Sequence, residues 1–146
     1  MADLGAGWGY LSLEVLARCP QVTRIDLFEA EWLALQAAQV NISAHAARCL
    51  ARYHWHDVTC GLPGRYNWIV MNPPFHVGKA TEVDLGRAFI NEAFTALLPG
   101  GTLLMVANRH LPYEAVLGDR FREVDVLTQT SSFKVFEARR AHMPFL

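Results

Sequence analysis

Apolar residues along the chain follow two alternating patterns. Short continuous runs rich in branched and aromatic residues predict buried strands, and longer stretches with apolar residues three or four positions apart predict helices. The predicted strands are residues 24–28, 52–55, 66–71, 102–107, 123–128 and 133–138. The predicted helices are residues 10–18, 31–42, 83–98 and a short segment that ends at residue 117. In the first helix, we expect Leu11, Val15 and Leu16 to face inward.

The order of these elements predicts the fold class. Alternating strands and helices are typical of an α/β fold with a doubly wound, mostly parallel sheet. The last two strands, joined by the polar tract 129–132, predict a hairpin that adds an antiparallel C-terminal edge. The first strand is expected to be truncated, because only Met1 and Ala2 stand where a run of apolar residues would precede a glycine-rich segment.

Composition limits the classes to which the protein can belong. The chain has 146 residues, of which 52% are hydrophobic, and this suits one domain with a sizeable core. It contains no apolar run of 18 residues and no charged-then-apolar leader, so no membrane partner is expected. Three cysteines without a Cys-x-x-Cys pair fit reduced thiols and a cytoplasmic location. The net charge of −1 gives no general attraction for nucleic acid.

Four potential metal ligands lie close together in the sequence. They are Cys49, His54, His56 and Cys60. Their spacing matches no zinc pattern, and two histidines two positions apart are also what one face of a strand presents. We therefore expect no metal site.

A short proline turn is the first candidate for chemistry. Asn72-Pro73-Pro74-Phe75 follows the predicted strand 66–71, and its prolines prevent the strand from continuing. Such a stiff turn fixes the amide of Asn72 and the carbonyl of Pro73 beside the ring of Phe75. Two hydrogen-bond acceptors next to a flat apolar surface suit a planar ring with an exocyclic amine. A proline-rich turn with a buried Phe is the structural alternative.

A glycine-rich segment is the second candidate. Gly5, Gly7 and Gly9 lie where a backbone can approach a ligand closely, and Glu29 follows 20 residues later at the end of the next strand. A carboxylate in that place can hold both hydroxyls of a ribose. The dinucleotide fingerprint needs its third glycine where Tyr10 stands. The pattern therefore favours a nucleoside ligand without a pyrophosphate.

Together these motifs resemble those of a known family. The segment from Asp3 to Gly9, with Glu29, Asp57 and the turn at Asn72, is similar to the class I S-adenosylmethionine-dependent methyltransferases. The stretches that narrow the resemblance are Phe75-His76, 106–113 and 133–135. They are similar to the catalytic C-terminal half of the bacterial small-subunit ribosomal RNA guanine-N2 methyltransferases. The resemblance covers nearly the whole chain.

The resemblance implies a cofactor site for S-adenosylmethionine. The cofactor-binding residues that it implies are Asp3, Gly5, Ala6, Gly7, Glu29, Asp57 and Asn72. Glu29 would bind the ribose hydroxyls and Asp57 the adenine amine, whereas the glycine segment would contact the methionine part and the ribose. An exposed strand-end charge remains the alternative for Glu29, and a helix or turn cap the alternative for Asp57.

The resemblance also implies a catalytic group and a substrate. Asn72 and Pro73 would accept the two hydrogens of the guanine amine while Phe75 stacks on the base, which must be unpaired or flipped out. His76 and Arg109 are candidate contacts to the RNA. Lys134 is a further candidate. Ordinary surface or strand-end roles remain the alternatives for all three.

The implied partner is ribosomal RNA or the small-subunit particle. In the resembled family a second, catalytically silent domain precedes this one and helps to bind RNA. We therefore expect residues 1–146 to be the methyltransferase domain of a longer protein and to bind RNA weakly alone. Adenine-N6 or protein glutamine amide methylation, an inactive RNA-binding module, and a nicotinamide-dependent oxidoreductase are the rival hypotheses.

Overall fold

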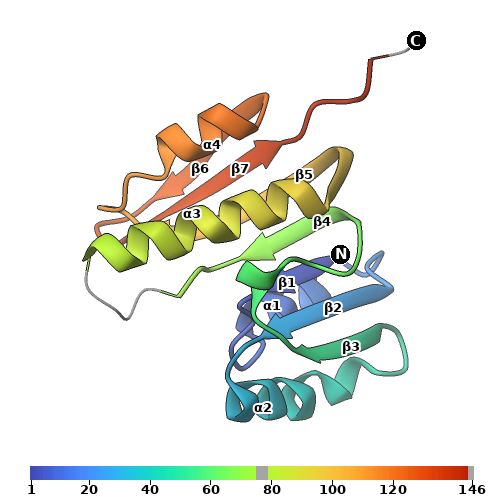
Figure 1. Ribbon diagram of the computed structural model, residues 1–146. Coiled ribbons are helices and arrows are strands. Elements are labelled where there is room, and N and C mark those ends of the chain that lie inside the picture. The colour runs from blue at the N-terminus through green and yellow to red at the C-terminus, as the bar shows by residue number, and fades with distance from the viewer. Residues whose placement is uncertain (75–78, 145–146) are drawn as a thin grey trace.

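A computed structural model gives the fold and describes residues 1–74 and 79–144 (Figure 1). The strands are β1 (Ala2–Leu4), β2 (Arg24–Glu29), β3 (Leu50–Trp55), β4 (Tyr66–Met71), β5 (Leu97–Asn108), β6 (Glu123–Gln129) and β7 (Phe133–Arg139). The helices are α1 (Tyr10–Arg18), α2 (Trp32–Ile42), α3 (Lys79–Ala96) and α4 (Glu114–Arg120), with short 3₁₀ turns η1 (Ser43–His45) and η2 (Val58–Cys60). Within these residues, no helix is long and apolar enough to cross a bilayer.

The strands of the described residues form one sheet in the order β3-β2-β1-β4-β5-β7-β6. The first five strands of that order run parallel, and β7 pairs antiparallel with both β5 and β6. The predicted α/β class, with its doubly wound sheet and antiparallel C-terminal edge, is confirmed. The chain leaves β1 toward β2 on one side and reaches β4 on the other, so the winding direction reverses between β1 and β4.

Helices cover both faces of the sheet (Figure 1). On one face, side chains of α3 and α4 such as Ile90 and Leu117 pack against Met71 and Phe136 of the strands. On the other face, α1 and α2 pack against β2, and residues such as Leu16 form a smaller core. Parallel sheets are covered on both faces, because their strands carry apolar side chains on each face and these must be shielded from water.

Several boundaries differ from those that the sequence predicts. The helix predicted over 83–98 spans Lys79–Ala96, and Leu97 instead lies in β5, fully buried and paired with Tyr66 of β4. The strand predicted at 52–55 begins at Leu50. The first strand is three residues long and fully inserted between two six-residue neighbours.

The inward face of α1 also differs from the prediction. The structure buries Leu16 as expected, but the second buried residue of the helix is Ser12, and Leu11 and Val15 are half-buried. Ser12 is polar, and its burial needs a hydrogen-bond partner on the sheet. Asp3 of β1 is that partner, as the site geometry shows.

Gly86 is predicted to be essential for the packing of α3. A Cβ at this position would overlap the hydroxyl and ring of the buried Tyr113, whose hydroxyl donates to the Glu82 carbonyl (3.0 Å). We expect Gly86→Ala to lower the free energy of unfolding by about 1–3 kcal/mol, as overpacking does. Chemical denaturation measures this change.

Gly118 in α4 provides the matched control. An added Cβ there meets no atom within 4 Å. Gly118→Ala should therefore stabilise the protein by roughly 0.5–1 kcal/mol through helix propensity alone. Equal effects of the two substitutions would contradict the packing assigned to Gly86.

Candidate active site

The candidate site lies where the winding direction of the sheet reverses. In open α/β sheets ligands bind at this point, beyond the carboxyl ends of the strands. Gly5 follows β1 and Asn72 follows β4, and these two strands are direct neighbours. The backbone oxygen of Asn72 lies 3.8 Å from where a Cβ on Gly5 would stand. The two motifs, 67 positions apart in the chain, therefore meet at one place.

A cavity of about 620 Å³ opens at this point. It brings together eight of the residues predicted to form the site: Asp3, Gly5, Ala6, Gly7, Glu29, Asp57, Asn72 and Pro73. Further residues line it that the sequence did not single out as site residues: Trp8, Tyr10, Leu11, Phe28, Ala30, Glu31, Ala34, His56, Val58, Pro74, Leu85 and Phe89. The cavity therefore joins the glycine turn, the ends of β2 and β3, and the proline turn.

The glycine turn is held to the end of β2 by its backbone. The N–H groups of Gly5 and Ala6 both donate to the Phe28 carbonyl (2.9 and 3.0 Å). Glu29 Oε2 accepts from the Gly7 N–H (2.7 Å), and its Oε1 accepts from the Glu31 N–H (2.9 Å). Each carboxylate oxygen has a second lone pair, so Glu29 can brace the turn and still accept a hydrogen bond from a ligand hydroxyl.

Helix α2 holds the other end of the glycine turn. Gly9 has a φ of +92°, and a Cβ there would stand 3.1 Å from Ile42 Cδ1 and 3.3 Å from the Ala38 Cβ. The side-chain amide of Asn41 donates to the Trp8 carbonyl (2.9 Å). A glycine is required at position 9 for both reasons, backbone conformation and close approach.

Asp3 is a buried carboxylate beside this turn. Only 1% of its surface is exposed, and its Oδ2 accepts from the Ser12 hydroxyl (2.6 Å). Its Oδ1 has no partner among the described residues, although it is buried and the residue lines the cavity. Burial raises the pKa of Asp3 to about 6, and the hydrogen bond from Ser12 offsets part of that rise. An unpaired buried oxygen at a cavity wall marks a place for a ligand donor.

Asp57 both caps a turn and lines the cavity. Its Oδ1 accepts from the Thr59 hydroxyl (2.7 Å) and the Thr59 N–H (2.9 Å) at the start of η2. These two hydrogen bonds hold the pKa of Asp57 below its ordinary value. The cap predicted as its alternative role is therefore present, and it fixes the carboxylate at the rim of the cavity.

The charge of the cavity is negative. The carboxylates of Asp3, Glu29, Glu31 and Asp57 line it, whereas the described lining residues include no lysine or arginine. A phosphate-bearing ligand would be repelled by such a wall. The arrangement suits a ligand that carries positive charge and hydroxyl groups, which disfavours the dinucleotide hypothesis.

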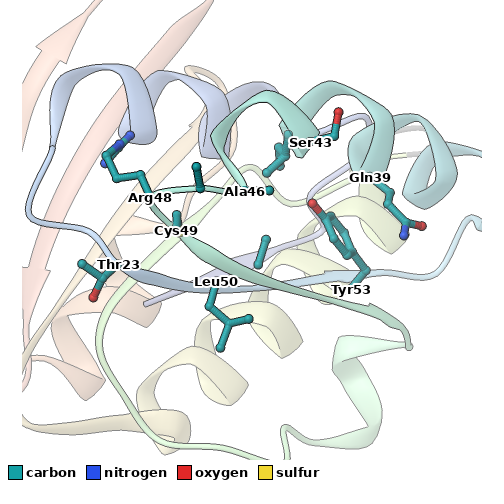
Figure 2. A pocket seen from close by; sticks show the side chains of 11 residues that line it. Thr23, Gln39, Ser43, Ala46, Arg48, Cys49, Leu50 and Tyr53 are labelled. Atoms are coloured by element: carbon teal, nitrogen blue, oxygen red, sulfur yellow. The ribbon is translucent and has the colours of Figure 1, made fainter.

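A second cavity, of about 510 Å³, lies between η1 and β3 (Figure 2). Among the described residues that line it, Arg48 carries the charge. Its guanidinium donates to the carbonyls of Leu16, Pro20 and Val22, near the end of α1. This charge therefore already serves the backbone, and the other polar groups of the wall, such as Gln39, Ser43 and Tyr53, are uncharged.

The remaining predicted residues do not join the cavity. Arg109 is exposed in the turn after β5 and is not part of the cavity wall. Lys134 of β7 forms an ion pair with Glu114 of α4, so its charge is engaged. Phe75 and His76 lie outside the described residues. Within the residues that the structure describes, no three His, Cys, Asp or Glu side chains gather as metal ligands.

Comparison with known proteins identifies similar chains. The methyltransferase small domain matches residues 1–137. The ribosomal RNA large subunit methyltransferase G of Alcanivorax borkumensis is 38% identical over 95% of this chain and 35% of its own length. The ribosomal RNA small subunit methyltransferase C of Escherichia coli is 34% identical over 93% of this chain and 39% of its own length.

Solved structures agree with this match. A 16S rRNA N2 guanine methyltransferase (RsmC) of Thermus thermophilus, in complex with AdoMet and guanosine, superposes with a TM-score of 0.79. It is 31% identical and is matched over 95% of this chain and 36% of its own. TrmN of the same organism has a TM-score of 0.74 at 21% identity, which supports the fold alone. The present chain thus spans between 35% and 39% of the length of the two curated relatives.

The buried carboxyl of Asp3 predicts a pH dependence of stability. Because the folded pKa of about 6 lies above the ordinary aspartate value of 3.8, the folded state holds its proton more tightly than the unfolded state. Stability should therefore fall by up to about 3 kcal/mol as pH rises from about 4 to above 6, and then level off. Denaturant unfolding across this range, compared with Asp3→Asn, measures the effect.

The Asp3→Asn variant should lack this fall, because it has no proton to lose at that position. Asp125→Asn, an exposed aspartate on β6, is the matched control. Parallel pH curves for the wild type and Asp3→Asn would show that burial of Asp3 does not set the trend.

Proposed function

The chain belongs to the methyltransferase small domain family, and on that basis we propose that it methylates the exocyclic N2 amine of guanine in ribosomal RNA. The observation that carries the proposal is the meeting of the glycine turn and Asn72 at one acidic cavity. The resemblance to a methyltransferase family, stated from the motifs, is confirmed. S-adenosylmethionine as the methyl donor of this family is confirmed as well.

The residues of the cavity fit this donor. S-adenosylmethionine supplies a methyl group activated by a sulfonium, and it also carries an ammonium group and ribose hydroxyls. The unpartnered Oδ1 of Asp3 and the negative wall match its positive charges. Glu29 has acceptor capacity left and would accept from the ribose hydroxyls, and Asp57, which Thr59 holds in place, would accept from the adenine amine. The first turn of α1 adds N–H groups that suit a carboxylate.

The acceptor amine would be held by the proline turn. The amine of guanine is a weak nucleophile because its lone pair is delocalised into the ring. Hydrogen bonds from its two protons to the Asn72 side-chain oxygen and the Pro73 carbonyl favour the tetrahedral nitrogen that can attack. Both residues line the cavity beside Gly5 and Gly7. Phe75 would stack on the base, and His76 and Arg109 would contact the RNA.

The protein needs no strong base for this reaction. Its main contribution is to hold the two reactants in line and to exclude alternative geometries. Once the nitrogen carries the new methyl group it becomes acidic, and its proton can leave to water. The Asn72 and Pro73 oxygens act while positive charge develops on the nitrogen, when they are most useful.

We further propose that residues 1–146 act as the methyltransferase domain of a longer cytoplasmic protein. The curated relatives are more than twice as long as the matched segment, which leaves room for other domains. A part elsewhere in the protein would supply much of the RNA affinity, since this chain has a net charge of −1. Relatives named for both ribosomal subunits are similar to this chain, so either subunit RNA is a candidate substrate.

Nucleoside analysis tests the acceptor. Ribosomal RNA extracted from a deletion strain is incubated with labelled S-adenosylmethionine and the protein, digested, and analysed by mass spectrometry. We expect N2-methylguanosine, formed about 100- to 1000-fold more slowly with Asn72→Ala. Appearance of N6-methyladenosine would refute the proposal in favour of adenine methylation. A parallel incubation with ribosomal proteins that gave label on glutamine would favour the protein amide. Calorimetric binding of S-adenosylmethionine without transfer to either substrate would favour an inactive RNA-binding module.

Substitutions of Asn72 and Glu29 should affect different parameters, the first the rate of methyl transfer and the second the affinity for the donor. Asn72→Ala removes an acceptor used in the transition state, so kcat should fall about 100- to 1000-fold. Glu29→Gln keeps the shape but loses the charge that braces Gly7 and binds the ribose, so the Kd of S-adenosylmethionine should rise about tenfold or more. Isothermal calorimetry and single-turnover rates measure the two effects. A reversed pattern, with Kd changed by Asn72→Ala and kcat by Glu29→Gln, would contradict these roles.

A further inference from the structure

Two large exposed aromatic side chains lie at the end of the glycine turn and at the start of α1. Trp8 is 52% exposed and Tyr10 is 53% exposed, and their ring centroids lie 5.5 Å apart. Neither residue belongs to the buried cores on the two faces of the sheet. Both line the cavity that holds Asp3, Glu29 and Asn72. Exposed aromatic groups at a cavity mouth are typical of binding surfaces rather than of packing.

The position of Trp8 is fixed by its backbone. Asn41 donates to its carbonyl (2.9 Å), and the preceding residue, Gly7, donates its N–H to Glu29 (2.7 Å). The next residue, Gly9, is wedged against α2 and donates its N–H to the Ala6 carbonyl (2.9 Å). An aromatic ring carried on so well-anchored a backbone is partly preorganised and loses less conformational entropy when it binds a partner.

The charge of the cavity decides which part of a nucleic acid could approach these rings. Four carboxylates line the wall, and the chain has a net charge of −1, so this surface does not attract phosphate groups electrostatically. A nucleobase is uncharged and has two flat faces. Stacking on Trp and Tyr is the interaction that binds unpaired bases without the help of positive charge.

We propose that Trp8 and Tyr10 form a stacking platform for an unpaired base of the acceptor RNA, across the cavity from Asn72. This proposal rests on the proposed function and extends it, because it names a substrate-binding element on the turn that also holds the methyl donor. The rings are tilted by 56° to each other, so they offer two separate faces rather than a parallel clamp. Asn41 is the positioning residue of the platform.

Binding measurements with single substitutions test the platform. The probe is a short, unpaired, fluorescein-labelled oligoribonucleotide that contains guanosine, and its Kd is measured by anisotropy with the whole chain. We expect Trp8→Ala and Tyr10→Ala each to raise this Kd about tenfold. The loss should be equal at low and high salt, because the lost contact is not ionic. Calorimetry on the same variants should show a smaller rise in the Kd of S-adenosylmethionine than in that of the oligoribonucleotide.

Trp68→Ala is the matched control. Trp68 is 43% exposed on β4 and lies outside the cavity wall. Its replacement should leave the oligoribonucleotide Kd unchanged, and Trp8→Phe should restore most of the affinity that Trp8→Ala loses. Asn41→Ala should raise the Kd by a smaller factor, with Gln36→Ala on the exposed side of α2 as its control.

Three results would overturn the platform. Equal RNA affinities of Trp8→Ala and Trp68→Ala would show that the Trp8 ring does not contact RNA. A rise in the Kd of S-adenosylmethionine as large as that for RNA would assign them to the donor. A loss that disappears at high salt would make the contact ionic. In each case, methyl transfer by the wild type would leave the proposed function standing, whereas absent transfer would refute that function independently.

Discussion

Parallel pairing of β1 with both β2 and β4 is the constraint on which the site depends. A strand that is hydrogen-bonded on both sides fixes the carboxyl ends of three strands at the same edge of the sheet. The chain must leave each strand there, and it does so through a glycine turn, a carboxylate and a proline turn. Because the winding direction reverses between β1 and β4, the connections that leave these two neighbouring strands turn to opposite sides. The cavity is the space that this reversal leaves open.

The side chains at these strand ends set the charge and the hydrogen-bonding groups of the cavity. Glu29 braces the glycine turn and also faces the cavity, so one carboxylate links the shape of the turn to its charge. Asp3 contributes a buried oxygen without a protein partner. Residues that bear negative charge lie on the β1–β3 side, whereas the neutral oxygens of Asn72 and Pro73 lie on the β4 side. A cationic donor and a neutral base can thus occupy neighbouring parts of one cavity without competing for the same contacts.

Local patterns predicted most of this arrangement, and the failures share a cause. The helix over 10–18 and the convergence of Gly5, Glu29, Asp57 and Asn72 follow from periodicity and from the rule that parallel strands end at one edge. Contacts between elements carry no such local signal. The pairing of Ser12 with Asp3 and that of Asn41 with Trp8 depend on how α1 and α2 pack on the sheet.

The end of α3 also could not be predicted from local sequence patterns. Helical spacing continues through residue 98, yet Leu97 leaves the helix to pair with Tyr66 in the sheet. Burial of Leu97 in the larger core outweighs its helix propensity, and only the three-dimensional contacts reveal that choice. In the glycine motif, Trp8 occupies a position that the pattern leaves unspecified, and Tyr10 stands where the dinucleotide fingerprint would need a glycine, so the exposure of both rings at the cavity could be found only from the structure.

The shortness of β1 links the site to the stability of the whole sheet. Three residues join the two halves of the sheet, and the glycine turn begins directly after them. Fraying of this strand would release the turn, and any molecule held by the turn would oppose the fraying by mass action. Ligand binding and the local stability of β1 are therefore thermodynamically coupled, so β1 should open less often when the cavity holds a ligand.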